Sequence, residues 1–312
     1  MRFFPALLML MASASLFSQE DCNLFNIQDL AAENLALHDS IAQFSVDTVM
    51  LQPDGSFEVY LSNGTTYTQV QGCTDAAVVN YDPAANTDDG SCSSCSSSIE
   101  FDGHTYSPVE IGDQCWFSEN LRTTVYANSD AIPAGLTDGE WSTTSSGATA
   151  VYGEDDGCNN YSPDIDACDE AQSLGEYGRL YNWYAVDDPR GLCPSGWHVP
   201  TDGEWTDLEN YITSQGFSLG TEGTALKSTS GWNSGGNGTD NFGFSALPGG
   251  YRYSDDVVGY FLNAGDNGVW WSSSPNGGVA WYRSLVNDRP DIGRDGIYPR
   301  DGFSVRCLRD AD

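Results

Sequence analysis

The sequence predicts an irregular α+β protein with few helices and short antiparallel strands. Three observations support this class. Helical spacing of apolar residues is confined to short stretches. Short runs rich in β-branched and aromatic residues recur between turn residues, among 34 glycines in all. Nine cysteines can staple a fold that has little regular structure, and 312 residues suffice for one or two domains plus small modules.

Residues 1–18 are typical of a secretory signal peptide. Arg2 supplies the positively charged N-terminal region, and the apolar run from Phe3 to Ala14 is too short to span a bilayer. Cys22 follows polar and acidic residues rather than the apolar residues of a lipoprotein signal. We therefore expect a secreted or cell-surface protein without membrane insertion.

The chain is strongly acidic, with a formal net charge of −33 and a single lysine, Lys227. Such a surface repels phosphate backbones and anionic lipids, which argues against nucleic-acid and membrane-surface roles. The carboxylates either keep the protein soluble or include some that bind Ca²⁺, a cation that prefers clusters of oxygen ligands. Because acidic residues are spread over the whole chain, solubility accounts for most of them.

Residues 19–45 carry an amphipathic helical pattern. Spacings of three and four alternate as in a heptad seam formed by Ile27, Leu30, Asn34, Leu37, Ile41 and Phe44. The pattern fits a single helix packed on its neighbour, and it also allows homo-oligomerisation through residues 27–44. Cys22, the odd cysteine, is expected to be unpaired, or to join two copies if the seam oligomerises.

Residues 46–71 predict a β-hairpin spacer, and residues 72–92 form a short acidic loop bounded by cysteines. Turns at Pro53–Gly55 and Asn63–Gly64 interrupt alternating apolar residues in the spacer. The loop is too short to bury a core, so a Cys73–Cys92 disulfide or a metal must hold it. Asp and Asn also favour turns for conformational reasons. The Ca²⁺ candidates in the loop are Asp75, Asp82, Asp88 and Asp89.

Residues 95–312 form the main domain. From Thr123 to Gly178 the chain is polar and lacks a helical period, which predicts a long loop region with short strands. The acidic segment 153–170 within it supplies a second set of Ca²⁺ candidates, Asp155, Asp156, Asp164 and Asp166. The alternative is a solvated acidic loop that a Cys158–Cys168 disulfide holds together.

The segment 191–212 organises this domain. Residues 197–199 alternate as in a short strand, and Thr201 or Asp202 supplies the N-cap of a helix with Glu204 in its first turn. That helix is expected to bury a stripe formed by Trp205, Leu208, Tyr211 and Ile212. The sheet on which it lies is expected from strand-like runs at 242–247, 268–274, 279–285 and 302–309.

Proximity and module boundaries suggest a disulfide scheme that leaves Cys22 unpaired. The pairs are Cys73–Cys92, Cys95–Cys115, Cys158–Cys168 and Cys193–Cys307. The last bond would tether the start of the central segment to the closing strand.

Ordered motifs between Ser96 and Asp310 resemble the Fibrobacter succinogenes major paralogous domain family. They include IGDQCW from Ile111, YGRLYNW from Tyr177, GWHVPT from Gly196, FGFSALPGGYR from Phe242 and GFSVRC from Gly302. The acidic loop 72–92 resembles a short Cys-bounded repeat of secreted proteins in Bacteroidota. The layout is also similar to the C-type lectin-like fold, including its sulfatase-modifying branch. The resemblance implies an exported surface module and says little about its chemistry.

The main domain departs from both functional branches of that fold. Formylglycine-generating enzymes use a late cysteine pair, whereas Cys307 is the only cysteine after Cys193. The EPN, QPD and WND motifs through which lectins bind sugar and Ca²⁺ do not occur in the main domain. Neither the catalytic site nor the usual sugar site is therefore carried over.

The expected function is a non-catalytic binding or adhesion module for glycans or surface polymers. No HExxH zinc motif occurs, and His198 has no apparent nucleophile partner, which favours a strand-edge or capping role. Strand alternation places one ring of the Trp270–Trp271 pair in the core. The alternatives are a disulfide-stapled subunit of a surface layer or fibre and a sulfatase-modifying-factor-like enzyme. Candidate stacking platforms in the loops from Gly231 to Ser272 are Trp232, Tyr251, Tyr253, Tyr260, Phe261 and Trp270.

Overall fold

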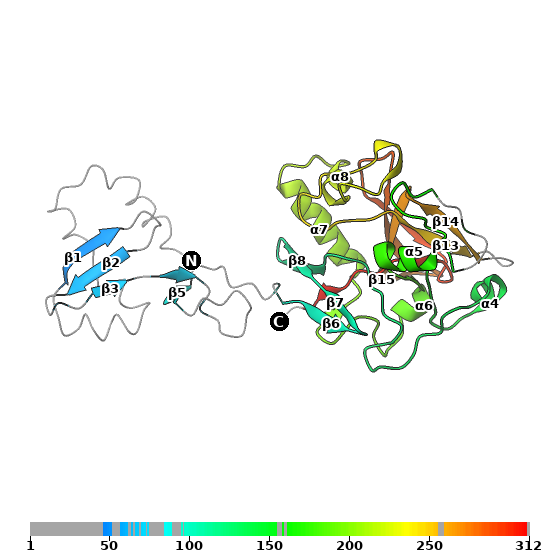
Figure 1. Ribbon diagram of the computed structural model, residues 1–312, viewed down its shortest axis with the longest axis horizontal. Coiled ribbons are helices and arrows are strands. Elements are labelled where there is room, and N and C mark those ends of the chain that lie inside the picture. Colours follow the sequence, from blue (N-terminus) through cyan, green and yellow to red (C-terminus); the bar gives the residue numbers. More distant parts are fainter. Residues whose placement is uncertain are drawn as a thin grey trace. The chain divides into compact units, whose positions relative to one another are not determined.

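The chain divides into two compact units, residues 1–94 and 95–312, in a computed structural model (Figure 1). The second unit begins at Cys95, where the sequence also places the start of the main domain. The structure describes residues 46–51, 57–61, 64, 66–68, 70–72, 74, 84–88, 95, 97–154, 158, 161–254 and 259–310. Several predictions lie outside these residues: the signal peptide 1–18, the helix 19–45 with its seam, Cys22, Cys73–Cys92, Asp75, Asp82, Asp89, Asp155 and Asp156.

The described part of the first unit contains two small sheets. Its strands are β1 (Val46–Leu51), β2 (Phe57–Leu61), β3 (Thr66–Thr68), β4 (Gln71–Gly72) and β5 (Thr87–Asp88). β1, β2 and β3 form an antiparallel sheet, so the predicted hairpin extends to a third strand. β4 pairs with β5 in parallel. Asn86 joins β5 to the chain that precedes β4: its Oδ1 accepts from the Val70 amide at 3.1 Å and its Nδ2 donates to the Thr68 carbonyl at 2.7 Å.

The main domain combines short helices with many short strands. Its helices are α4 (Asp138–Thr143), α5 (Glu170–Tyr177), α6 (Trp183–Val186), α7 (Asp202–Ser214), α8 (Glu222–Leu226) and the 3₁₀ turn η3 (Asn233–Gly235). Its first strands are β6 (Ile99–Phe101), β7 (His104–Tyr106), β8 (Pro108–Ile111), β9 (Gln114–Phe117), β10 (Thr149–Ala150), β11 (Leu180–Asn182) and β12 (Trp197–His198). The later strands are β13 (Gly249–Ser254), β14 (Gly259–Ala264), β15 (Asn267–Asn276), β16 (Val279–Val286), β17 (Gly293–Ile297), β18 (Gly302–Phe303) and β19 (Leu308–Arg309). The fold is therefore α+β.

The largest sheet has the order β10-β11-β18-β13-β15-β16-β17, with β14 paired to β13. Apart from a single parallel contact between β13 and β15, its pairs are antiparallel. A second sheet has the order β12-β19-β9-β8. The predicted closing strand 302–309 is wrong as one element, because β18 belongs to the first sheet and β19 to the second. The chain crosses between the sheets at Ser304–Cys307, all of which is buried.

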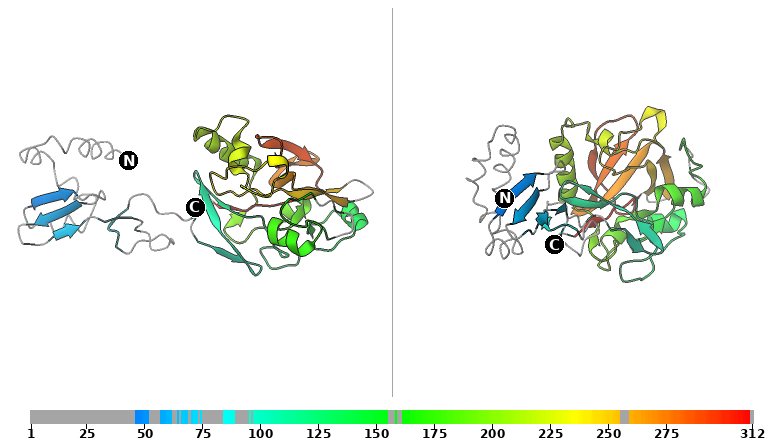
Figure 2. Two further views of the ribbon diagram at one scale, coloured as in Figure 1. Left: turned by 45° about the horizontal axis from the view of Figure 1, so that its top comes forward. Right: turned by 60° about the vertical axis from the view of Figure 1, so that its left-hand side comes forward.

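Helices cover both faces of the large sheet. α7 packs on the face of β15 that bears Trp270, whereas α6 packs on the face that bears Trp271. Figures 1 and 2 show α7 and α8 together, away from α4. Trp270 packs with the α7 residues Trp205 and Leu208, whereas Trp271 packs on Phe303 with ring centroids 4.4 Å apart. Both indoles are buried, so the prediction that one ring lies in the core is confirmed and the second ring lies there as well, because both sides of β15 are covered here.

The helix α7 begins as its sequence predicts. Thr201 is the N-cap: its hydroxyl accepts from the Glu204 amide at 3.2 Å, and the Glu204 carboxylate accepts from the Thr201 amide at 2.7 Å. Trp205, Leu208 and Ile212 are buried, and Tyr211 is partly exposed. No helix among the described residues is long and apolar enough to cross a bilayer.

Two sequence-based element assignments are corrected. The region 123–178 contains the helices α4 and α5, whose N-caps Thr137 and Asp169 accept backbone hydrogen bonds. The run Phe242–Leu247 is not a strand, because Gly243 and Ser245 adopt φ values of 67° and 50° that interrupt extended backbone.

Three expected disulfides are confirmed, Cys95–Cys115, Cys158–Cys168 and Cys193–Cys307, and the fourth expected pair, Cys73–Cys92, lies outside the described residues. Cys193 and Cys307 are both buried in the cluster that contains Trp271, so their bond joins the segment before α7 to the chain between β18 and β19. The buried Arg283 secures α7 from the other side, with its guanidinium paired to Asp202 at 2.7 Å and to Glu209 at 2.5 Å. The Cys193–Cys307 disulfide and the Arg283 ion pairs therefore fix α7 and the segment before it relative to the sheets.

Candidate functional site

Three of the six predicted stacking platforms are wrong, because they lie in the core. Trp232, Phe261 and Trp270 expose 3%, 0% and 1% of their surface. The Trp232 indole donates to the Ala246 carbonyl at 3.0 Å, and the Trp270 indole donates to Asn120 Oδ1 at 2.8 Å. Their N–H groups are thus satisfied internally, as buried indoles require.

The other three platforms, Tyr251, Tyr253 and Tyr260, are partly exposed and lie together on β13 and β14. Tyr253 and Tyr260 stand opposite each other in the antiparallel pair, with ring centroids 5.6 Å apart and ring planes tilted by 52°. Tyr251 lies two residues before Tyr253 and therefore on the same face of β13. Its hydroxyl accepts from Asn263 Nδ2 at 3.3 Å.

Tyr282 of β16 joins this group, although it was not among the predicted residues. Tyr251 and Tyr282 both pack edge-to-face on Phe303, with centroid distances of 6.0 and 5.1 Å. Strand alternation could have indicated Tyr282, because it points away from the α7 side to which Arg283 is bound. We call Tyr251, Tyr253, Tyr260 and Tyr282 the tyrosine face. Its residues come from three strands of one sheet.

Nearby carboxylates raise the pKa values of two residues of the tyrosine face. Burial, and then the charges of Asp295 and Asp301, raise the pKa of Tyr282; burial followed by Asp301 raises the pKa of Tyr251. The phenols of Tyr251 and Tyr282 therefore remain protonated donors at neutral pH. Asp301 itself is 1% exposed and accepts from the Ser254 amide at 2.7 Å, and burial raises its pKa to about 7. The site combines apolar ring surface, hydroxyls and negative charge.

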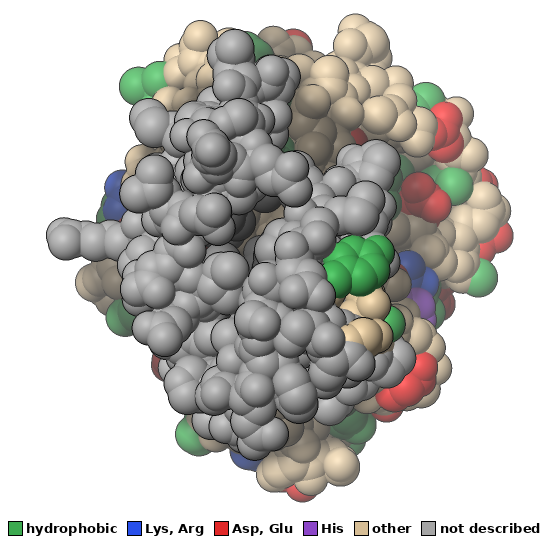
Figure 3. Space-filling model, turned by 90° about the vertical axis from the view of Figure 1, so that its left-hand side faces the viewer, with side chains coloured by type: hydrophobic (Ala, Val, Ile, Leu, Met, Phe, Trp, Pro, Cys, Tyr) green, Lys and Arg blue, Asp and Glu red, His purple; other side chains and the backbone are tan. Residues whose placement is uncertain are grey.

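The described calcium candidates belong to two separate units of the chain. Asp88 lies in β5, whereas Asp164 and Asp166 are exposed in the loop before α5. One oxygen of Asp166 accepts from the Cys168 amide at 3.1 Å, a local turn contact. Among the residues that the structure describes, no three His, Cys, Asp or Glu side chains form a group that could hold a metal ion. On the face shown in Figure 3, described Asp and Glu side chains are dispersed.

His198 links three elements of the main domain through both of its ring nitrogens. Its Nε2 lies 3.0 Å from Glu204 Oε1 and its Nδ1 lies 2.6 Å from Asp310 Oδ1, which links β12, α7 and the chain after β19. Glu204 and then Asp310 raise the pKa of His198 against the opposing effect of burial. The Glu204 pKa falls to about 2, because hydrogen bonds from His198 and Thr201 outweigh its burial.

One comparison with known proteins identifies the family. The Fibrobacter succinogenes major domain matches residues 109–309, about two thirds of the chain. No curated protein and no solved structure matches this chain at a significant level. The match covers β8 to β19, including α7 and the tyrosine face. The chain therefore belongs to the Fibrobacter succinogenes major domain family.

Proposed function

We propose that residues 95–312 form an exported, non-catalytic binding or adhesion module whose ligand contacts the tyrosine face. The observation that carries this proposal is that four partly exposed tyrosines from three strands lie together on one face of the sheet. Two of them, Tyr251 and Tyr282, pack against the same ring, that of Phe303. Packing and strand pairing hold these rings, so a ligand would order few additional side chains. Tyrosine supplies a large contact area at low entropy cost.

The proposed ligand is a neutral polysaccharide or similar surface polymer. Aromatic ring faces bury the C–H surface of a sugar, while the phenolic hydroxyls and the Asn263 amide can exchange hydrogen bonds with its hydroxyls. Asp295, Asp301 and the net charge of −33 disfavour anionic polymers. This ligand class therefore agrees with both the shape and the charge of the face.

Two further features support an extracellular setting. The three disulfides are typical of oxidising compartments, and the N-terminal sequence pattern is typical of export.

The C-type lectin-like arrangement remains part of the proposal: short antiparallel strands, few helices and the Cys193–Cys307 link are compatible with it. Such a fold would present a ligand surface on a disulfide-held frame.

Ca²⁺ binding by the two acidic segments also remains a proposal, resting on the number of carboxylates in 72–92 and 153–170. A metal that binds only the folded state raises its Tm. EDTA should therefore lower the Tm of the full chain, and a Tm that EDTA leaves unchanged contradicts structural calcium.

Binding of the full chain to microcrystalline cellulose, xylan and mannan tests the ligand proposal. We expect at least one of these neutral polymers to retain the protein, and the double substitution Tyr253→Ala, Tyr260→Ala to weaken binding about tenfold, equivalent to ~1.4 kcal/mol. The matched control is Tyr161→Ala, because Tyr161 is 54% exposed and lies outside the tyrosine face. Absence of binding to all three polymers, or equal losses in the double variant and the control, contradicts the proposal.

A further inference from the structure

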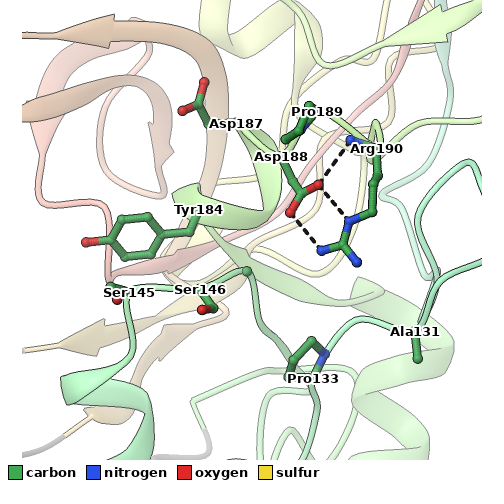
Figure 4. A pocket seen from close by; sticks show the side chains of 10 residues that line it. Ala131, Pro133, Ser145, Ser146, Tyr184, Asp187, Asp188, Pro189 and Arg190 are labelled. Atoms are coloured by element: carbon green, nitrogen blue, oxygen red, sulfur yellow. Dashed lines mark hydrogen bonds and ion pairs between the residues drawn. The ribbon is translucent and has the colours of Figure 1, made fainter.

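A polar pocket lies outside the tyrosine face and shares no residue with it. It has a volume of about 420 Å³, within the usual range for small-ligand sites. Three chain segments that are distant in sequence meet there, 131–133, 145–147 and 184–190 (Figure 4). Its polar lining includes Ser145, Ser146, Tyr184, Asp187, Asp188 and Arg190, and we call it the Arg190 pocket.

The Arg190 guanidinium is held in place on two sides. It lies over the buried Tyr126 ring at 3.9 Å from the centroid. Its Nε and one Nη each donate to Asp188 at 2.8 Å, and the other Nη donates to Asp130 at 3.2 Å. The Asp188 pKa falls to about 2, mainly through the hydrogen bonds from Arg190, so this carboxylate is ionised at physiological pH. The ion pair is therefore preorganised, and two of the five guanidinium N–H groups lie outside these three bonds.

Gly147 brings the 145–147 segment close to Tyr126, the ring over which Arg190 lies. A Cβ at this position would lie 2.1 Å from the Tyr126 hydroxyl and 2.9 Å from the Ala185 Cα, so only glycine permits the approach. The buried Tyr126 hydroxyl makes no hydrogen bond of normal geometry with the described residues. Burial, and then the charge of Asp188, raise its pKa, so it stays a protonated donor behind the pocket wall.

We propose that the Arg190 pocket binds one neutral sugar unit through its vicinal hydroxyls. The planar Asp188–Arg190 pair presents acceptors and donors side by side, a pattern that adjacent hydroxyls can match. Ser145 and Ser146 add hydroxyls, and Figure 4 shows Tyr184 above them on the side of the pocket opposite Arg190. The Arg190 guanidinium pairs with two carboxylates, those of Asp130 and Asp188, and Asp187 adds a third carboxylate to the pocket lining, which together disfavour anionic sugars.

Isothermal titration of the full chain with glucose, xylose, mannose and galactose tests this proposal, with glucuronate as the anionic comparison. At least one neutral sugar should bind with a millimolar Kd, and glucuronate should bind more weakly. Arg190→Lys, which loses the bidentate pairing, should weaken binding at least fivefold. Asp187→Asn should also weaken it, and this exposed side chain gives a second variant if Arg190→Lys fails to fold.

The control is Arg289→Lys, because Arg289 forms the same kind of bidentate pair with Asp291, at 3.1 and 2.7 Å, away from the pocket. Sugar affinity in this variant and in Tyr253→Ala, Tyr260→Ala should equal that of the wild type, which separates the pocket from the tyrosine face. Absence of binding up to about 50 mM sugar overturns the proposal. So does unchanged affinity in both Asp187→Asn and a folded Arg190→Lys.

Discussion

Replacing Asp301 by asparagine should stabilise the main domain at neutral and alkaline pH. The Asp301 carboxyl is 1% exposed, and burial raises its pKa from 3.8 to about 7. Because the folded state favours the protonated form, its contribution to stability is fully present below about pH 3.8 and is lost as the pH rises through about 7. Above that pH the fold must accommodate a buried carboxylate.

The size of the effect follows from the pKa difference. About 3 pH units at 1.36 kcal/mol per unit give an upper bound of ~4 kcal/mol in the free energy of unfolding between acidic and alkaline pH. The substituted asparagine would keep an oxygen that accepts from the Ser254 amide and would lose the charge. The hydroxyl of the same Ser254 makes no hydrogen bond with the described residues and so remains an acceptor for a new amide donor. We expect Asp301→Asn to exceed the wild type by ~2–4 kcal/mol at about pH 8 and to show no such advantage at about pH 4.

Urea unfolding followed by tryptophan fluorescence measures this difference at each pH. All nine tryptophans lie after Cys95, so their fluorescence reports on the main domain alone. The control is Asp295→Asn, on the exposed side of β17, for which we expect no comparable pH-dependent gain. The reasoning is refuted if the stability difference between Asp301→Asn and the wild type stays constant from about pH 4 to about pH 8.

Three other predictions concern the frame around α7. Removing the 114-residue link with Cys193→Ala, Cys307→Ala should cost ~4–5 kcal/mol of unfolding free energy, and a loss below ~1 kcal/mol in urea titrations would contradict the loop-entropy argument. Thr201→Ala should lower the free energy of unfolding by ~1 kcal/mol because it removes the N-cap of α7, whereas Thr201→Ser should keep most of this stabilisation. His198→Gln should lower the Tm at about pH 5.5 and less so at about pH 8.5, because a His pKa raised by Glu204 and Asp310 stabilises the fold at low pH and loses this effect as the pH rises through it. A Tm difference of the same size at both pH values would rule out a charged His198 as the cause.

Local signals in the sequence determined the elements whose partners are close along the chain. The capping box of Thr201 and Glu204 is made within one helical turn. The apolar spacing that follows it correctly predicts the buried Trp205, Leu208 and Ile212, whereas Tyr211 is partly exposed. The sequence also predicts β15 and β16, because these two strands follow each other in the chain and pair directly with one another. Three disulfides followed from cysteine proximity and module boundaries, and the family motifs located the main domain.

Only the tertiary structure decided which aromatic rings face a ligand. Strand alternation assigns side chains to two faces but does not say what covers each face. Layers on both sides of β15 bury Trp270 and Trp271, whereas the same sheet leaves Tyr282 partly exposed. The Arg190 pocket likewise depends on three distant segments that meet through packing, and Gly147 has a role only because the Tyr126 ring lies behind it. Contacts of this kind are set by long-range packing, so no local pattern in the sequence specifies them.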